Sequence, residues 1–269
     1  MSYPHPPAMG VAISGGDRSG PSHAHLRGHV GTERRPLRAI PLTRRYEAAW
    51  LTSSGEIETS NRIAPAIPLF EHACSALARG AVVQTTAGPC AIEDLMPGSH
   101  VLVAGGETCL VRWIGSMTHF AAMRPDCSDG RTCMTRLTAE ALGEGRPVAD
   151  LVLGPGARIR MDSARVRRIA DAEAAFVPAC ALVDGIGIIE VAPVAPITTY
   201  HVVLDRHAAL RVAGVEVESY HPGVGLEQLV DPRMLELFVA LFPHIRRIED
   251  FGEMALPRLG MKAMAALWE

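Results

Sequence analysis

Several polar residue types are almost missing from this chain of 269 residues, and their scarcity limits the chemistry it can perform. Lys262 is the only lysine, Asn61 is the only asparagine, and Gln84 and Gln228 are the only glutamines. A phosphate-binding loop that ends in Lys-Ser or Lys-Thr, or a Schiff-base lysine inside a core, therefore has no residue to use away from the C-terminal end. A polar site rich in asparagine is excluded for the same reason.

Aromatic residues are also scarce, at 5% of the chain, although hydrophobic residues reach 48%. Small aliphatic side chains must therefore fill the core of one medium-sized domain with appendages. No apolar run approaches the roughly 18 residues of a membrane-spanning helix, and the first residues lack the basic and apolar regions of a signal peptide. We expect no transmembrane segment, and a soluble protein that is cytoplasmic or exported without a classical signal.

The charge is distributed unevenly along the chain. The net charge is −3, but residues 1–45 hold seven Arg against Asp17 and Glu33, which gives +5 there and leaves −8 for the remainder. The acidic remainder argues against specific nucleic-acid binding, because phosphate contacts need a basic surface. Residues 1–45 also contain six Pro and six Gly without apolar periodicity, which predicts a flexible tail. An electrostatic docking arm is the alternative, and its four histidines could bind metal loosely.

Six cysteines in a chain of this length do not form a disulfide scaffold. Cys127 and Cys133 are separated by more residues than the two cysteines of a zinc knuckle. The sequence has no second Cys or His pair near them that would complete a four-ligand zinc site. We expect reduced thiols, no metal site and no cofactor. The cysteines are Cys74, Cys90, Cys109, Cys127, Cys133 and Cys180.

Apolar spacing predicts a short helix that starts at Pro68, carries Cys74 on its apolar stripe and ends at Gly80. Asp231 as N-cap and Pro232 in the first turn predict a C-terminal helix, whose apolar face we expect to pack on the rest of the domain.

Between these helices the pattern alternates with period two, which is typical of short strands. Turns are expected at Gly88–Pro89 and Gly105–Gly106, and an exposed loop at 117–133. The predicted strands are 82–85, 101–104, 108–114, the two arms of 150–160, 176–180, 187–191, 200–204, 208–212 and 215–219. The sequence therefore predicts a mainly β fold with four parts: a tail at 1–45, a lead-in segment with a short helix at 46–75, an all-β domain at 76–223 and a helical extension at 224–269.

Three segments in order resemble the Hint (Hedgehog/intein) domain of the bacterial stand-alone type: residues 79–85, residues 91–98 leading to 111–115, and residues 200–207 leading to 217–220. The resemblance covers roughly residues 70–223. It implies a pseudo-twofold all-β fold, which agrees with the strand pattern.

Active Hint domains break a peptide bond through an N-to-S or N-to-O acyl shift. Such a shift needs a Cys or Ser after the scissile bond and groups that protonate the leaving nitrogen and stabilise the oxyanion. The resemblance places the nucleophile four residues before Gly80, at Ala76, which cannot attack. Cys74 and Ser75 lie nearby, but we expect Cys74 to be a packed, unreactive thiol and Ser75 to face the polar side of the helix without an activating partner.

The family's Thr-x-x-His element falls on Gly154–Ala157, so its threonine is replaced by Gly154 and its histidine by Ala157. The single asparagine, Asn61, precedes the domain, which excludes splicing through asparagine cyclisation.

Three polar residues remain as acid or base candidates: His201, Asp205 and His207. A structural role is the main interpretation for all three, with Asp205 capping a turn. His119 and His221 are lone histidines without a partner in sequence.

The sequence therefore predicts a Hint-type domain that has lost autoproteolysis and serves as a binding or structural module for an unknown protein partner. The alternative is self-cleavage with Cys74 or Ser75 as nucleophile and His201 or His207 as acid and base. A third interpretation, cargo of an export system, lacks the calcium-binding repeats that would support it.

Overall fold

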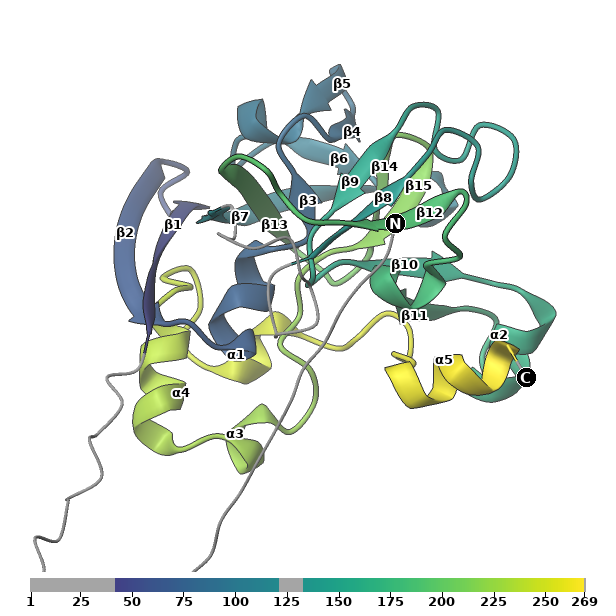
Figure 1. Ribbon diagram of the computed structural model, residues 1–269. Helices are drawn as coiled ribbons and strands as arrows, with labels where there is room; N and C mark the ends of the chain where they lie inside the picture. Colours follow the sequence, from purple (N-terminus) through teal and green to yellow (C-terminus); the bar gives the residue numbers. More distant parts are fainter. Residues whose placement is uncertain (1–41, 121–132, 269) are drawn as a thin grey trace, which may run out of the picture. The chain divides into compact units, whose positions relative to one another are not determined.

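The structure is a computed structural model that describes residues 42–120 and 133–268 (Figure 1). The predicted tail, with its cluster of four histidines, lies outside the described residues except for its last positions. Most of the predicted loop at 117–133 lies outside them as well. Within the described part, strand β7 extends to His119, and Met117 is buried, so the prediction that the exposed loop begins at Met117 is wrong.

Antiparallel strands dominate the described chain, which confirms the mainly β prediction. In order, the strands are β1 (Thr43–Leu51), β2 (Ile57–Pro65), β3 (Leu77–Ala78), β4 (Val82–Thr85), β5 (Gly88–Ala91), β6 (His100–Leu102), β7 (Thr108–His119), β8 (Met134–Leu137), β9 (Leu151–Leu153), β10 (Arg158–Met161), β11 (Ala175–Pro178), β12 (Ile188–Val191), β13 (Ile197–Leu204), β14 (Ala209–Val212) and β15 (Val215–Glu218). The helices are α1 (Pro68–Glu71), α2 (Ala164–Ala170), α3 (Leu226–Leu229), α4 (Pro232–Val239) and α5 (Met261–Trp268).

Strand β7 is the centre of the strand order. It pairs with β6 at one end, with β13 along most of its length, and with β1 on the other edge. Its long pairing with β13 brings residues about 80 positions apart into register, for example His119 opposite Ile197. Strand β3 pairs with both β13 and β9, so the segment that leads into it is held at the middle of the strand order.

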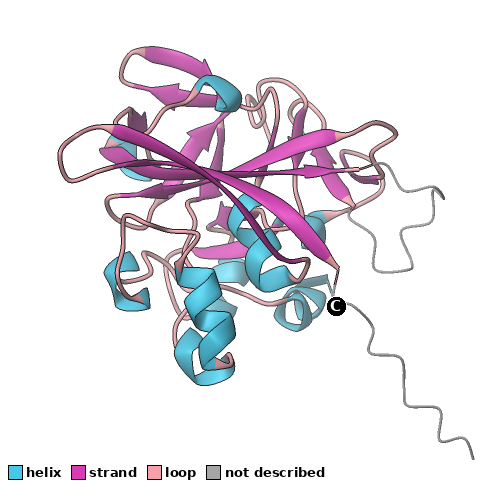
Figure 2. Cartoon of the chain, turned by 90° about the vertical axis from the view of Figure 1, so that its left-hand side faces the viewer, coloured by secondary structure: helices cyan, strands magenta, loops and turns pink. Residues whose placement is uncertain are grey.

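Two groups of buried side chains hold these strands in place. The first consists of small aliphatic residues from the strands between β3 and β15, as the composition predicts. The second is aromatic and joins β1, β7 and the C-terminal helices. In it the Trp113 and Phe242 rings lie 4.5 Å apart, and the Trp113 indole donates a 2.8 Å hydrogen bond to the carbonyl of Leu241. This contact confirms that the C-terminal helical segment packs on the β domain (Figure 2).

The N-cap predicted for that segment is also confirmed. The Asp231 carboxylate accepts a hydrogen bond from the Arg233 amide, and Pro232 occupies the first turn of α4. A side-chain acceptor at this position satisfies one of the unpaired amides of a helix start.

Other local predictions are wrong. The helix that starts at Pro68 covers only four residues and continues as a 3-10 helix over His72–Cys74, because the chain then joins the sheet as β3. Gly80 follows a strand and does not end a helix. Gly88–Pro89 is not a turn but the start of β5, which pairs with β4. The hairpin of β1 and β2 and the helix α2 have no counterpart in the predicted elements, and α5 lies within the predicted helical extension without having been predicted as a separate helix.

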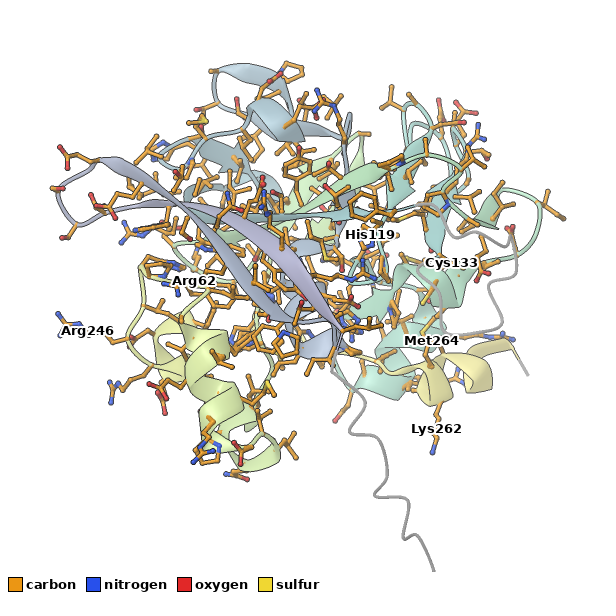
Figure 3. All side chains as sticks on the ribbon, turned by 60° about the vertical axis from the view of Figure 1, so that its left-hand side comes forward. Arg62, His119, Cys133, Arg246, Lys262 and Met264 are labelled. Atoms are coloured by element: carbon orange, nitrogen blue, oxygen red, sulfur yellow. The ribbon has the colours of Figure 1, made fainter. Side chains whose placement is uncertain are left out.

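The four thiols Cys74, Cys90, Cys109 and Cys180 are free, as expected, whereas Cys133 is disulfide-bonded. The expectation of a reduced thiol is therefore wrong for Cys133, which is only half-buried and is not held inside the core as Cys74 and Cys109 are (Figure 3). In the part of the chain that the structure describes, no helix combines the length and the apolar character needed to cross a membrane.

Candidate functional site

The segment that leads into β3 is enclosed between β13 and the turn that joins β9 to β10. The Ala76 amide donates to the carbonyl of Tyr200 at 3.0 Å, and the Ala76 carbonyl accepts from the Gly154 amide at 2.8 Å. The carbonyl of Ser75 accepts from the Gly156 amide at 2.9 Å. The backbone at Ser75 and Ala76 is therefore fixed by strand β13 and by the Gly154–Ala157 turn. The family resemblance places its Thr-x-x-His element at this turn.

Ser75 lies fully inside this enclosure. Its exposed fraction is 0%, and its hydroxyl oxygen has no hydrogen-bond partner among the described residues. The prediction that Ser75 faces the polar side of a helix is wrong, because the residue follows the 3-10 helix with extended φ and turns its side chain inward. A buried hydroxyl without a partner costs about 1–3 kcal/mol of folding free energy. No described group lies where it could accept the proton of the Ser75 hydroxyl.

The two glycines of the turn opposite Ser75 have no room for a Cβ atom. A Cβ atom added at Gly154 would lie 2.3 Å from the carbonyl oxygen of Ser75. One added at Gly156 would lie 2.8 Å from the Ser75 hydroxyl and 2.9 Å from the His72 carbonyl. Ala157 closes the turn and is itself buried. A threonine at position 154 therefore has no room for its Cβ atom, and at position 157 the histidine is replaced by a small, buried alanine.

Cys74 is buried, as expected, in the aromatic group of side chains with Phe70 and Trp113. Burial raises the pKa of its thiol far above the ordinary range. Since only the thiolate is a strong nucleophile, this burial disfavours attack by Cys74.

A hydrogen-bonded chain that the sequence did not predict contacts the peptide between Cys74 and Ser75. The Thr199 hydroxyl donates to the carbonyl of Cys74 at 2.8 Å, and the Nε2 atom of His119 lies 2.8 Å from the same hydroxyl. All four residues are almost completely buried. The one hint in the sequence is that Thr199 and His201 lie two residues apart and so share one face of a strand. His119 could not be predicted as their neighbour, because it belongs to another strand, β7.

His201 lies beside this peptide but bonds elsewhere. Its Nδ1 atom lies 2.7 Å from the carbonyl of His72, and its Nε2 atom lies 3.3 Å from the carbonyl of Glu218. Burial lowers the pKa of His201 to about 4, so the ring is neutral at pH 7. Both ring nitrogens of His201 lie against backbone carbonyls, and the contact with His72 holds the chain that precedes Ser75. Neither nitrogen is hydrogen-bonded to Ser75.

The neutral His201 makes the stability of the fold depend on pH. The unfolded chain binds a proton at the ordinary pKa near 6.5, whereas the folded chain binds it only near pH 4. Acid therefore favours the unfolded state throughout this window. Lowering the pH from 7 to 5 should reduce the free energy of unfolding by about 2 kcal/mol through His201 alone. Urea midpoints at both pH values test this, and they should differ less in a His201→Gln variant; equal midpoints in the parent would contradict it.

Asp205 and His207 do not form a pair. The Asp205 carboxylate accepts from the amides of Leu110 and Arg206, which holds the turn after β13. The Ala255 amide donates to Nδ1 of His207 at 3.0 Å, so the ring proton is on Nε2, which lies 3.2 Å from a carboxylate oxygen of Glu218. Each residue therefore has its own structural partners.

Glu218 is the charged centre that the sequence did not reveal. Its carboxylate is 2% exposed and lies 2.8 Å from the Arg258 guanidinium and 3.6 Å from that of Arg158. Burial would raise its pKa, but the bonds from His207 and Arg258 hold the pKa below its ordinary value. A pocket of about 200 Å³ opens beside these groups and is also lined by His72 and Gly156. Two guanidinium groups against one carboxylate leave this pocket with net positive charge.

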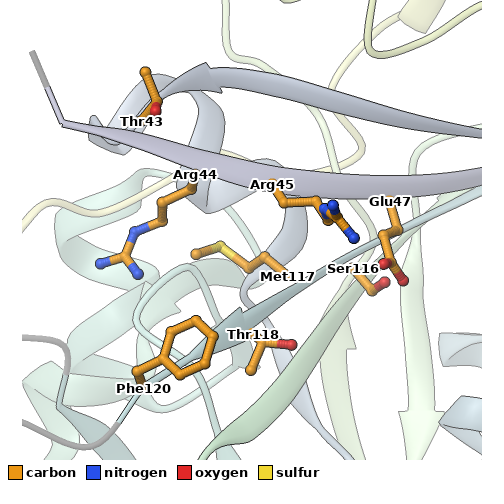
Figure 4. A pocket seen from close by; sticks show the side chains of 8 residues that line it. All are labelled: Thr43, Arg44, Arg45, Glu47, Ser116, Met117, Thr118 and Phe120. Carbon is orange, nitrogen blue, oxygen red and sulfur yellow. The ribbon is translucent and has the colours of Figure 1, made fainter.

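A larger pocket of about 440 Å³ lies elsewhere, between β1 and the end of β7 (Figure 4). Arg44, Arg45 and the exposed Phe120 line it. Arg44 is held there by an ion pair with Glu71. None of the groups around Ser75 reaches this pocket.

A family model described as the Hint domain matches residues 75–224 of the chain. The chain belongs to the Hint domain family. Among solved structures, the crystal structure of the MchDnaB-1 intein is similar to this Hint domain at 13% identity and a TM-score of 0.30, over 54% of this chain and 100% of that chain. No curated protein matches it. The matched region of this Hint domain begins at Ser75, the residue enclosed by the turn with Gly154 and Gly156.

Proposed function

We propose that this Hint domain has lost self-processing and serves as a binding or structural module. The observation that carries the proposal is the state of Ser75: its hydroxyl is buried and has no proton acceptor among the described residues. An acyl shift needs a base for this hydroxyl and an acid for the Ser75 nitrogen. The position that the resemblance gives to the nucleophile itself holds Ala76.

The turn supports the same conclusion. Gly154 lies against the backbone of Ser75 so closely that the threonine of a Thr-x-x-His element has no space there, and Ala157 stands at the histidine position. Thr199 does donate to the carbonyl before Ser75, which polarises that peptide. One donor at the carbonyl does not protonate the leaving nitrogen, so the bond stays intact. Thr199 and His119 act in this proposal as structural hydrogen-bonding groups.

The Ser75→Ala variant tests whether the hydroxyl does anything in the folded chain. Removing a buried polar atom without a partner should leave the free energy of unfolding unchanged or raise it by up to about 1 kcal/mol. Thr199→Val is the matched control, because that hydroxyl has two partners, and it should lose about 1–3 kcal/mol. Chemical denaturation gives both values. A loss in Ser75→Ala as large as in the control would show that the serine hydroxyl has a partner and would contradict the proposal.

A further inference from the structure

Strand β2 forms an open edge of the sheet. Within the described residues it pairs only with β1. The two ends of the hairpin fix which backbone groups are used: the Ala66 amide donates to Leu42 at 2.8 Å, and the Thr52 amide donates to Glu56 at 2.8 Å. Hydrogen-bonded positions alternate along an antiparallel ladder, so the even-numbered residues of β2 bond to β1. The odd-numbered residues therefore direct their amides and carbonyls away from β1. These are Ile57, Thr59, Asn61 and Ile63. This free side of β2 is the outer edge of the hairpin in Figure 1.

The sequence of this edge is complementary to itself. Two copies of β2 can run antiparallel with Ser60 of one copy opposite Ser60 of the other. In this register, the numbers of any two facing residues add up to 120. Glu58 then faces Arg62, and Ile57 faces Ile63. We propose that β2 pairs in this register with β2 of a second copy of the chain and so forms a two-fold symmetric dimer.

The charges match in this register. Glu58 and Arg62 are exposed, and neither has an ion-pair partner in the described part of the chain. They are even-numbered, so they face each other at positions without backbone hydrogen bonds, where opposed Cα atoms approach to about 4.5 Å. The two-fold axis produces the pair twice. Arg62 lies on β2 beside α4, toward the outside of the molecule (Figure 3).

The apolar side chains match on the opposite face. Ile57 is 42% exposed and Ile63 is 73% exposed, so both side chains are available for contact with a partner. Facing isoleucines on neighbouring strands shield each other from water and stabilise the pairing. The free backbone groups of both isoleucines, and those of Thr59 and Asn61, find partners at the same time. A nine-residue edge buries less area than a standard interface, so we expect a weak dimer that forms only at high chain concentration.

Charge reversal on the full chain tests the register. Sedimentation velocity from about 5 to 500 µM should show the parent changing from monomer to dimer. Glu58→Arg places two arginines opposite each other twice, and Arg62→Glu does the same with two glutamates. Each variant should weaken dimerisation at least about tenfold. Circular dichroism should show that both remain folded, since both side chains are exposed.

Mixing the two variants provides the decisive result. In the mixed pair, positions 58 and 62 of the E58R chain both carry arginine, and each faces a glutamate of the R62E chain. An equimolar mixture of E58R and R62E should therefore dimerise about as well as the parent. A parent that stays monomeric at about 500 µM would overturn the proposal. So would single variants that dimerise like the parent, or a mixture that stays monomeric.

A cysteine at the axis tests the register independently. Ser60→Cys places two thiols opposite each other, and mild oxidation should link two chains. Thr59→Cys is the matched control, because in this register residue 59 faces residue 61 and not itself. Equal crosslinking of both variants, or none with Ser60→Cys, would contradict the register, and the parent measures the background from its own free thiols.

Discussion

Gly154→Ala should reduce the free energy of unfolding by about 3 kcal/mol, although it adds only one methyl group. The new Cβ atom would lie 2.3 Å from the carbonyl oxygen of Ser75 and 2.8 Å from its carbonyl carbon. Both atoms belong to backbone that is fixed by hydrogen bonds, so the contact cannot be relieved by rotating a side chain. Overpacking of this kind typically costs about 1–3 kcal/mol and occasionally more. A domain of this size should lose about 6–12 °C in Tm.

Gly260→Ala is the matched control for this prediction. No atom lies within 4 Å of a Cβ added at Gly260, and its φ is not in the left-handed region. Its cost should remain below about 1 kcal/mol, the usual effect at a helix start. Thermal unfolding followed by circular dichroism compares the two variants. Equal stability would mean that position 154 accepts a side chain, and the argument that the threonine of a Thr-x-x-His element cannot fit would fail.

Glu218→Gln should destabilise the fold by about 3–5 kcal/mol, because it leaves a buried cluster without its only carboxylate. Arg258 at 2.8 Å, Arg158 at 3.6 Å and the His207 ring all lie against this group. Glutamine keeps the shape but not the charge, so two partly buried guanidinium groups would lose the charge partner that the buried side chain at position 218 provides. Glu216→Gln is the control on the same strand: it loses an ion pair with Arg160 that is partly exposed, and should cost less than about 1 kcal/mol.

The pH dependence of the Glu218→Gln effect has a definite sign. The pKa of Glu218 is held below its ordinary value, so its contribution is present above the carboxyl pKa of the unfolded chain. It is lost as the pH falls through the folded pKa. The difference between parent and variant should therefore be largest near pH 7 and shrink in acid. A difference that stays constant down to about pH 3 would contradict the assigned charge.

Strands with a local signal could be predicted from the sequence. Gly105–Gly106 between two alternating runs predicts the hairpin of β6 and β7, which the structure contains. The pattern at 200–219 predicts a meander of three strands, and that is only partly right: β14 and β15 pair with each other, whereas β13 pairs with β7 and β3. The hairpin of β1 and β2 was not predicted, because β2 is exposed on both faces and shows no alternation of apolar residues. The helix from Pro68 was predicted too long because pairing with β9 and β13 outweighs the helical spacing of Leu77.

The candidate site was predicted only where a residue type decides the chemistry. Ala76, Gly154 and Ala157 remove functional groups whatever surrounds them, and that could be read from the sequence once the family resemblance was seen. The burial of Ser75 and the cluster at Glu218 could not be predicted. They depend on contacts between β7, β13, β15 and the C-terminal segment, and no local pattern encodes these contacts.

The loss of self-processing is tested most directly by the intact mass of the purified full chain during incubation with hydroxylamine and with dithiothreitol. Hydroxylamine cleaves an ester formed at Ser75 or a thioester formed at Cys74, dithiothreitol cleaves the thioester, and either cleavage splits the chain there. The account predicts one intact mass at every time point, as in the Cys74→Ala and Ser75→Ala variants. Two fragments that meet at Cys74–Ser75 or Ala73–Cys74, and that disappear in the matching alanine variant, would contradict it.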